Sequence, residues 1–236
     1  MSATTVKELE AKVDALEHQR FSTDDNAEAV VIDDSVRRAR ASVEQLGIYS
    51  AAWKFVPPPY YTWPLEKRAE CLRARSIQYL CKSLLLENKK APSYCSGAEA
   101  DEDPTNPKFV LVVLQYAATL DEKKLTNAIR ALRKDVKSRL DDSKFDFRIA
   151  SEEDNRVITG YEHNSVTPFG LLRPVPIVLS SALEPLKFFW MGGGHEHLKL
   201  GMAYSDFCRS LSPIVADIST PRTALELSSG IHDEGM

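Results

Sequence analysis

The sequence has few cysteines and no long apolar segment, and both features narrow the class of protein. None of its four cysteines (Cys71, Cys81, Cys95, Cys208) belongs to a CxxC pair, so no disulfide framework is expected. No apolar run approaches the ~18 residues that a membrane-spanning helix needs. The N-terminus also lacks the apolar core of a signal peptide. We therefore expect a soluble, cytoplasmic protein with no membrane partner.

An excess of charge of one sign is also missing. The chain has 30 Lys and Arg against 34 Asp and Glu, which gives a net charge of −4. Binding to nucleic acid would therefore depend on a local basic patch. No GxSxG elbow, Walker motif or GxGxxG motif is found. The absence of these motifs excludes the hydrolases and nucleotide-binding proteins that contain them.

A chain of 236 residues with 43% hydrophobic content can bury one sizeable core. We expect an amphipathic, coiled-coil-like helix at 1–20, a linker at 21–33, one domain at 34–220 and a loose tail at 221–236. The first helix has apolar residues at alternating spacings of three and four: Val6, Leu9, Val13 and Leu16. Alone it would be marginal in water, so it either docks on the body or a partner helix, or is a frayed extension.

Periodicity and turn signals predict the elements of the main domain. Helices are expected near 35–46, 65–80, 120–140, 151–158 and 204–211. Strands are expected at 82–87, 108–115, 145–150, 175–180, 187–192, 197–202 and 213–219. Because the later short strands must pair in antiparallel or mixed fashion, the pattern favours an α+β domain with a mixed sheet.

Two surface segments could contact a partner. The helix expected at 120–140 carries the most basic face of the chain: Lys123, Lys124, Arg130, Arg133, Lys134, Lys137 and Arg139. Such a face is usually only solvated, but it could touch phosphates. The segment "KFVPPPYYTWP" (54–64) is expected to be an exposed aromatic loop, since its prolines remove backbone donors. It is either a rigid connector or a polyproline ligand.

The stretch "WMGGGHEHLKLGM" (190–202) places three glycines and two histidines among short strands. The glycines allow either a tight hairpin or the approach of a ligand to bare backbone amides, and the third glycine favours the ligand. His195 and His197 would point the same way from a strand. A zinc ion would need further ligands at a recognisable spacing, and none is present. We therefore expect no metal and no cofactor.

Lys82 stands at the start of an apolar strand, between Cys81 and Ser83. Neighbours on a strand face opposite sides, so Lys82 is badly placed to activate either residue as a nucleophile. Its ammonium could instead bind a phosphate or polarise a reacting group. The alternative is a lysine that simply extends from the end of a strand into solvent.

Several segments together resemble one family, the YbaK and prolyl-tRNA-synthetase-associated editing domains, which are aminoacyl-tRNA deacylases. The resemblance runs in order over residues 35–219. It rests on "SVRRARASVEQLGI", "CKSLLLE", "KFVLVVLQ", "LDEKKLTNAI", "FRIASEEDNRVITGYEHNSVTPFGL", "VPIVLSSAL" and "FFWMGGGHEHLKLGMAYSDFCRSL". It implies a mixed, curved β-sheet flanked by helices, with a pocket for the aminoacylated 3′ end of tRNA. The N-terminal helix, the proline loop and the insert at 88–107 depart from compact members.

The resemblance also implies roles for individual residues. Lys82 would hold the phosphate of the terminal nucleotide, and the amides of Gly192, Gly193 and Gly194 would approach the aminoacyl carbonyl. Thr167, Pro168 and Phe169 would wall the substrate pocket. His195 and His197 would lie beside its opening.

We expect a trans-editing hydrolase that removes alanine or cysteine from tRNA specific for proline. The first alternative is a non-catalytic tRNA-binding or scaffold subunit, and the second is a deacylase of small esters unrelated to tRNA. The N-terminal helix would tether the protein to an aminoacyl-tRNA synthetase or a multi-synthetase assembly.

Overall fold

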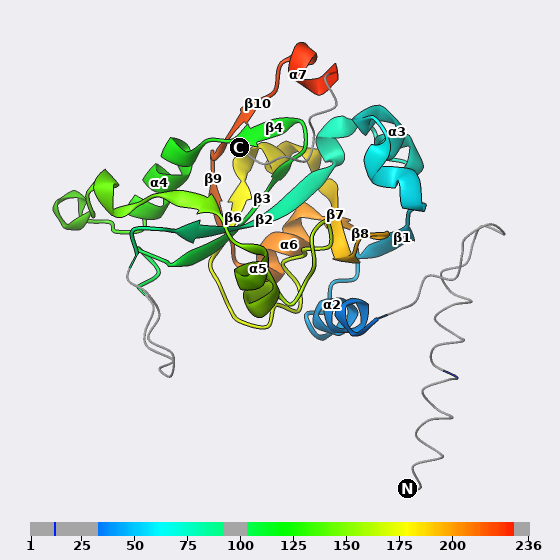
Figure 1. The fold of residues 1–236 in the computed structure, drawn as a ribbon, viewed down its shortest axis with the longest axis horizontal. Helices are drawn as coiled ribbons and strands as arrows, with labels where there is room; N and C mark the ends of the chain where they lie inside the picture. Colours follow the sequence, from blue (N-terminus) through cyan, green and yellow to red (C-terminus); the bar gives the residue numbers. More distant parts are fainter. Residues whose placement is uncertain (1–11, 13–32, 92–102, 229–236) are drawn as a thin grey trace, which may run out of the picture.

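The computed structural model describes residue 12 and residues 33–91 and 103–228, where short strands and helices alternate irregularly (Figure 1). The strands are β1 (Ala52–Phe55), β2 (Cys81–Asn88), β3 (Phe109–Gln115), β4 (Ala118–Leu120), β5 (Phe147–Ile149), β6 (Ile177–Ser180), β7 (Phe188–His195), β8 (Leu198–Ala203), β9 (Ile214–Ala216) and β10 (Ser219–Pro221). The α-helices are α2 (Asp34–Gln45), α3 (Leu65–Cys71), α4 (Glu122–Arg130), α5 (Glu152–Thr159), α6 (Tyr204–Leu211) and α7 (Ala224–Ser228). Apart from residue 12, the helix expected at 1–20 lies outside the described residues, as does nearly all of the linker at 21–33.

The strands form three sheets. The largest has the order β5-β2-β3-β6-β9 and is mixed, because β2 pairs antiparallel with β3 and β5 while β6 runs parallel to β3 and β9. A second sheet, β1-β8-β7, is antiparallel throughout, and β10 pairs with β4. The prediction of an α+β domain with a mixed sheet flanked by helices is confirmed.

Helix α2 covers one side of the second sheet and shows why the local sequence folds as it does. Asp33 caps it by accepting a hydrogen bond from the amide of Val36 at 2.9 Å. Its apolar face (Val36, Ala39, Val43) is buried, and Ala39 contacts β7 near its glycines. The helix expected at 35–46 begins one residue earlier than predicted.

The helix expected at 120–140 is shorter than predicted. Leu125 and Ile129 are fully buried and Leu132 packs half-buried against the same core cluster, but Val136, which would come next on that face, is 69% exposed. Burial therefore gives no reason to continue the helix as far as 140. The helix ends at Arg130, whose guanidinium donates to the carbonyl of Leu140 at 2.6 Å as the chain folds back. Part of the expected basic face is paired with acids: Lys124 with Asp217, Arg130 with Asp142, and Arg133 with Asp103.

Three further expectations are corrected. Residues 52–55 form the edge strand β1, which the sequence did not predict, and the proline segment includes a short 3-10 turn at Pro58–Thr62. Residues 65–80 form α3 and a 3-10 turn at Ile77–Tyr79, not one helix. The tail expected to be loose from 221 includes the end of β10 and α7, so residues 221–228 are part of the folded body. Residues 229–236 lie outside the described part.

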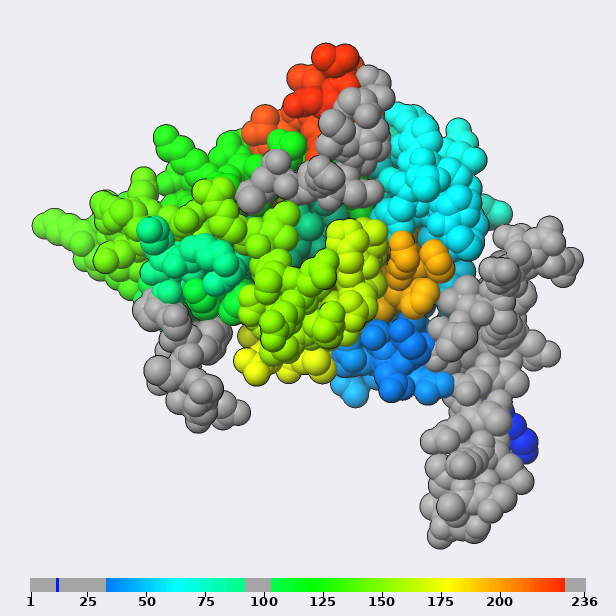
Figure 2. All heavy atoms as spheres, in the orientation of Figure 1, coloured from blue at the N-terminus to red at the C-terminus, as the bar shows by residue number. Residues whose placement is uncertain are grey.

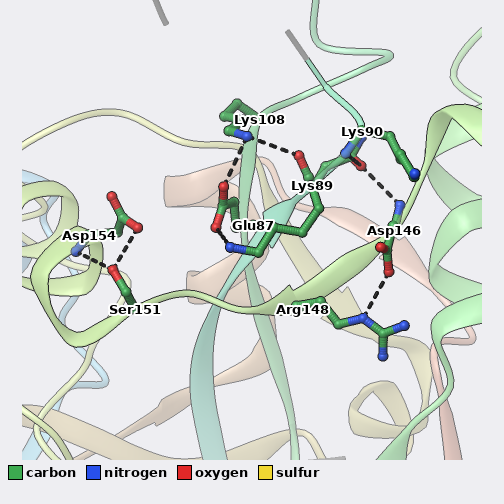
Figure 3. Close-up of polar contacts among 9 residues, drawn as sticks. Glu87, Lys89, Lys90, Lys108, Asp146, Arg148, Ser151 and Asp154 are labelled. Carbon is green, nitrogen blue, oxygen red and sulfur yellow. Dashed lines mark hydrogen bonds and ion pairs between the residues drawn. The ribbon is translucent and has the colours of Figure 1, made fainter. Parts of the chain in front are cut away.

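A buried carboxylate organises the far end of β2, where β2, β3 and β5 meet (Figure 3). Glu87 is only 9% exposed and pairs with the ammonium groups of Lys89 and Lys108, the latter at 2.9 Å. Burial alone would raise the pKa of Glu87, but the hydrogen bonds from the two lysines outweigh it and lower the pKa. The folded state therefore favours the ionised carboxylate.

We predict that Glu87→Gln lowers the free energy of unfolding at neutral pH by about 1.5–3 kcal/mol, since it removes the charge from hydrogen bonds to charged groups. A lowered pKa in the folded state contributes stability above the ordinary carboxyl pKa, and this contribution is lost as the pH falls through the folded pKa. Chemical denaturation at a series of pH values between 7 and about 3 measures both effects.

The matched control is Glu153→Gln, because Glu153 is exposed. It should leave both stability and its pH dependence unchanged. An unchanged acid limb in Glu87→Gln would contradict the assigned role of Glu87.

Candidate functional site

A small pocket opens where the start of β2 meets β7 and β8. It holds about 240 Å³ of empty space, including space open to solvent. Six buried residues line it: Tyr60, Leu72, Leu80, Cys81, Met191 and Lys199. Four half-buried residues complete the lining: Tyr61, Tyr116, Trp190 and Gly192. The lining is thus largely apolar and aromatic, with one buried cation.

The pocket arises from a contact between two sheets. Leu80 forms an isolated parallel bridge with Trp190, which brings the start of β2 beside β7. The segment before α3 supplies Tyr60 and Tyr61, so the aromatic proline loop is one wall of the pocket. In Figure 2, orange atoms of the β7–β8 region reach the surface between the cyan segment that contains α3 and the blue α2.

The three consecutive glycines belong to β7, and each lies against another part of the protein. A Cβ on Gly192 would overlap the carbonyl oxygen of Val166, and one on Gly193 would lie 3.0 Å from the Leu198 side chain. Gly194 has a φ of +92°, and a Cβ there would lie 3.0 Å from the Cβ of Ala39. Close packing within the protein therefore explains all three glycines, and only Gly192 also lines the pocket.

A bulge separates Gly192 from His195 in the pairing of β7 with β8. Within it, the amide of Gly194 donates to the carbonyl of Ser165 at 3.1 Å. This donor is therefore used inside the protein. Of the three glycines whose amides are expected to face a substrate, Gly192 is the one that lines the pocket.

The loop at 160–170, which precedes β6, is held by one buried ring and one guanidinium. Arg38 of α2 donates to the carbonyls of Gly160 and Gly170 at 2.6 and 2.7 Å, and its guanidinium lies 4.7 Å from the ring centroid of Tyr161. The Tyr161 hydroxyl donates to the carbonyl of Phe169 at 2.6 Å. Burial is the main cause that raises the pKa of Tyr161 to about 12, so this hydroxyl stays a donor.

Thr167, Pro168 and Phe169 lie in that loop and are buried. Phe169 packs in the core with Phe207, with ring centroids 5.9 Å apart. The Thr167 hydroxyl is buried without a hydrogen-bond partner among the described residues, which is a costly state for a polar group. The three residues back the wall that Val166 forms against Gly192, and none of them lines the pocket itself.

Lys82 lies beside the pocket at the start of β2. It is 7% exposed, and alternation along the strand sends its side chain to the face opposite that of Cys81. Its ammonium lies 5.9 Å from the ring centroid of Tyr116, which is one of the lining residues. Lys82 and Gly192 therefore belong to one region of the molecule, with the Tyr116 ring next to the ammonium.

Cys81 lines the pocket, but its chemistry does not suit a nucleophile. Burial raises the pKa of its thiol well above the usual value, and the thiolate is the reactive form. The Ser83 hydroxyl on the same face is buried without a partner among the described residues. The structure thus agrees with the geometric argument against a Cys–Lys or Ser–Lys dyad.

Lys199 is the pocket residue that sequence reasoning missed. It is 4% exposed, and its ammonium donates to the Tyr61 hydroxyl at 2.6 Å and to the Glu196 carbonyl at 2.8 Å. It also lies 4.3 Å from the ring centroid of Tyr61 and 5.2 Å from that of Tyr60. The sequence signal that could have found Lys199 is its place between Leu198 and Leu200 in an apolar strand. A lysine is rarely buried there unless other groups hold its ammonium.

The two histidines follow the glycines at the end of β7. The amide of His197 donates to Nδ1 of His195 at 3.1 Å, and the ring centroids lie 5.5 Å apart. Burial is the main cause that lowers the pKa of His195, which favours the neutral imidazole that this bond requires. In the described part of the chain, no cluster of three or more potential metal-ligating side chains is found.

Comparison with known families identifies the fold. The model of the aminoacyl-tRNA editing domain matches residues 65–209, which is more than half of the chain.

This chain belongs to the aminoacyl-tRNA editing domain family. The match includes Lys82, the loop at 160–170, the three glycines and Lys199. Membership supports deacylation of aminoacyl-tRNA as the general activity, and it confirms the family resemblance read from the sequence. No curated protein matches the chain.

Solved structures resemble this editing domain at low sequence identity. One is a protein provisionally described as a trans-editing enzyme for prolyl tRNA synthetase, with 20% identity and a TM-score of 0.60 over 80% of this chain and 98% of that one. Another is a hypothetical protein, with 16% identity and a TM-score of 0.57 over 78% of this chain and 99% of that one. These matches show that the fold is shared. Among the described helices, none is long and apolar enough to cross a membrane.

We predict that Gly194→Ala destabilises the editing domain by about 2–5 kcal/mol. A positive φ costs a residue with a side chain about 1–2 kcal/mol, and overpacking against Ala39 and the carbonyl of Ser35 adds about 1–3 kcal/mol. Thermal or chemical unfolding of the purified variant measures the loss.

Gly47→Ala is the control that separates the two costs. Gly47 has a φ of +61°, but an added Cβ would meet nothing closer than 4.0 Å. It should therefore lose only the conformational part. Equal losses in the two variants would contradict the packing role assigned to Gly194.

Proposed function

We propose that this protein is a trans-editing hydrolase that cleaves the ester bond of mischarged aminoacyl-tRNA. The observation that carries the proposal is the pocket in which Gly192, Lys199 and four aromatic rings meet beside Lys82, in a chain of the editing-domain family. An opening of this size suits the aminoacyl end of a tRNA better than a folded macromolecule. We further propose that it acts in the cytoplasm.

In the proposed reaction, water attacks the ester carbonyl and the ribose oxygen leaves. The amide of Gly192 donates to the developing oxyanion, and Lys82 holds the substrate from the side of Tyr116. Such preorganised donors stabilise the transition state without a protein nucleophile. The raised pKa of Cys81 favours this route, because the thiol on the wall stays protonated and unreactive. A neighbouring ribose hydroxyl of the substrate holds the attacking water.

The remaining site residues shape the pocket. Thr167, Pro168 and Phe169 support the wall formed by Val166, and Gly193 and Gly194 let β7 approach that wall and α2. The Thr167 hydroxyl has no hydrogen-bond partner among the described residues, which leaves it available to a water. The hydrogen bond from the amide of His197 to Nδ1 of His195 fixes the end of β7.

We propose alanine or cysteine esterified to tRNA specific for proline as the substrate. The small volume of the pocket and its apolar residues Leu80, Cys81 and Met191 favour a short side chain. A hydrophobic pocket discriminates by only about 1–3 kcal/mol for each methylene. The selection between alanine and cysteine is therefore expected to be modest.

Lys82→Ala is predicted to lower kcat/KM for mischarged tRNA by about 100-fold or more, the loss typical of removing one group that stabilises the transition state. A deacylation panel with alanyl-, cysteinyl- and prolyl-tRNA measures it, together with circular dichroism to show that the variant is folded.

The matched control is Lys134→Ala, since Lys134 is exposed in the segment after α4. It should retain full activity. A wild-type protein that binds these tRNAs but hydrolyses none of them would favour the alternative of a non-catalytic tRNA-binding or scaffold subunit. Full activity of folded Lys82→Ala would remove Lys82 from the mechanism.

A further inference from the structure

Arg68 of α3 lies behind the aromatic wall of the pocket and is almost fully buried. Its exposed fraction is 1%, although an arginine is rarely buried without groups that hold its charge. It lies on the face of α3 that carries the buried Leu65 and Ala69, so the packing of the helix keeps its side chain in the interior. Arg68 is not one of the residues that line the pocket.

The guanidinium of Arg68 meets three tyrosine rings that do line the pocket, those of Tyr60, Tyr61 and Tyr116. Its central carbon lies 5.6, 5.2 and 5.6 Å from their respective ring centroids. A cation is attracted to a ring face within about 6 Å of the centroid. Tyr60 and Tyr61 come from the proline segment, whereas Tyr116 follows β3. One buried guanidinium therefore joins two distant parts of the aromatic wall.

The guanidinium also holds the backbone of the proline segment. Nε of Arg68 donates to the carbonyl of Trp63 at 2.9 Å, and Nη2 donates to the carbonyl of Tyr61. The rigid, planar fork of an arginine holds two carbonyls at fixed angles, and the ammonium of a lysine does not reproduce this geometry. Arg68 thus contacts both the backbone and the ring of Tyr61.

Tyr61 carries this restraint across the pocket. Its hydroxyl accepts a hydrogen bond from the Lys199 ammonium at 2.6 Å and donates to the Asn164 carbonyl at 2.8 Å. Lys199 belongs to β8, and Asn164 belongs to the loop at 160–170. The aromatic wall, the second sheet and the loop therefore meet at one hydroxyl, and a shift of Tyr61 would change the width of the pocket.

Burial of an ionic side chain is costly, and an apolar side chain of similar size often stabilises a protein equally well or better. The geometry that Arg68 imposes explains its presence better than stability does. We propose that Arg68 is a positioning residue that fixes the width of the pocket, and with it the size of the aminoacyl group that the protein accepts. This inference rests on the proposed function and adds a residue that acts through the tyrosine rings without touching the substrate.

Hydrogen exchange of the full-length protein tests the restraint without any substrate. The amides of Tyr60 and Trp63 donate to the carbonyls of Pro57 and Tyr60 at 2.9 and 3.2 Å, which closes the turn that carries the rings. In Arg68→Lys, which keeps the charge but loses the fork, these amides should exchange faster. The matched control is Arg130→Lys, since Arg130 also holds a backbone carbonyl but ends α4, at the other end of the molecule from α3 (Figure 1). It should leave both amides as in the wild type.

Hydrolysis is then compared on tRNA specific for proline that carries either alanine or the larger valine. A looser wall should raise KM for the alanyl ester and leave kcat close to that of the wild type. In Arg68→Lys, the ratio of kcat/KM for the alanyl ester to that for the valyl ester should fall by about 10-fold, the low end of what one methylene is worth in a pocket. Partial unfolding would lower kcat equally for both esters and keep this ratio. Arg68→Met should show larger changes, and Arg68→Lys decides the test if Arg68→Met unfolds.

Unchanged exchange at Tyr60 and Trp63 in folded Arg68→Lys would overturn the inference, whatever the activity. Faster exchange with an unchanged KM and an unchanged ratio would also overturn it, because the wall would then not limit the substrate. Wild-type protein that hydrolyses neither ester contradicts the proposed function. In that case, faster exchange in Arg68→Lys still supports the restraint that Arg68 places on the wall.

Discussion

The close approach of β7 to its neighbours is the constraint on which the candidate site depends. At Gly192 the strand lies against the carbonyl of Val166, and at Gly194 it lies against α2. Side chains at these positions would separate the second sheet from the loop and from α2. The glycines therefore set where β7 runs, and through pairing they set where Lys199 of β8 faces the pocket. Their role in the fold and their place at the site have the same physical cause.

Two cations, the half-buried Arg38 and the buried Lys199, join the segments that surround this contact. Arg38 holds the loop at 160–170 through two carbonyls, while Tyr61 links Lys199 to the carbonyl of Asn164 at 2.8 Å. Neutral oxygens and ring faces around these two cations replace part of the hydration that burial removes.

Much of the fold follows from local sequence. Ser151 caps α5 and Gly160 ends it in the left-handed conformation, and both features are readable from residue type. The buried run at 109–115 is a central strand. The helix after Asp121 could not be bounded from local sequence. Residues past Arg130 still favour a helix, but they lack the buried apolar face that would stabilise it. Edge strand β1 could not be predicted from the sequence, because four residues before a proline run show no clear hydrophobic periodicity. The strand forms through its pairing with β8.

The sequence by itself determined the α+β class and the family resemblance, because these depend on residue type and order along the chain. It also singled out Lys82 and the glycine run as candidate site residues. It could not determine that Gly193 and Gly194 serve packing, that Phe169 lies in the core, or that Lys199 lines the pocket. Those features depend on which distant segments meet: Ala39 with Gly194, Phe207 with Phe169, and Tyr61 with Lys199. Only the tertiary structure decides these contacts, since strand pairing and close packing join residues that no sequence spacing relates.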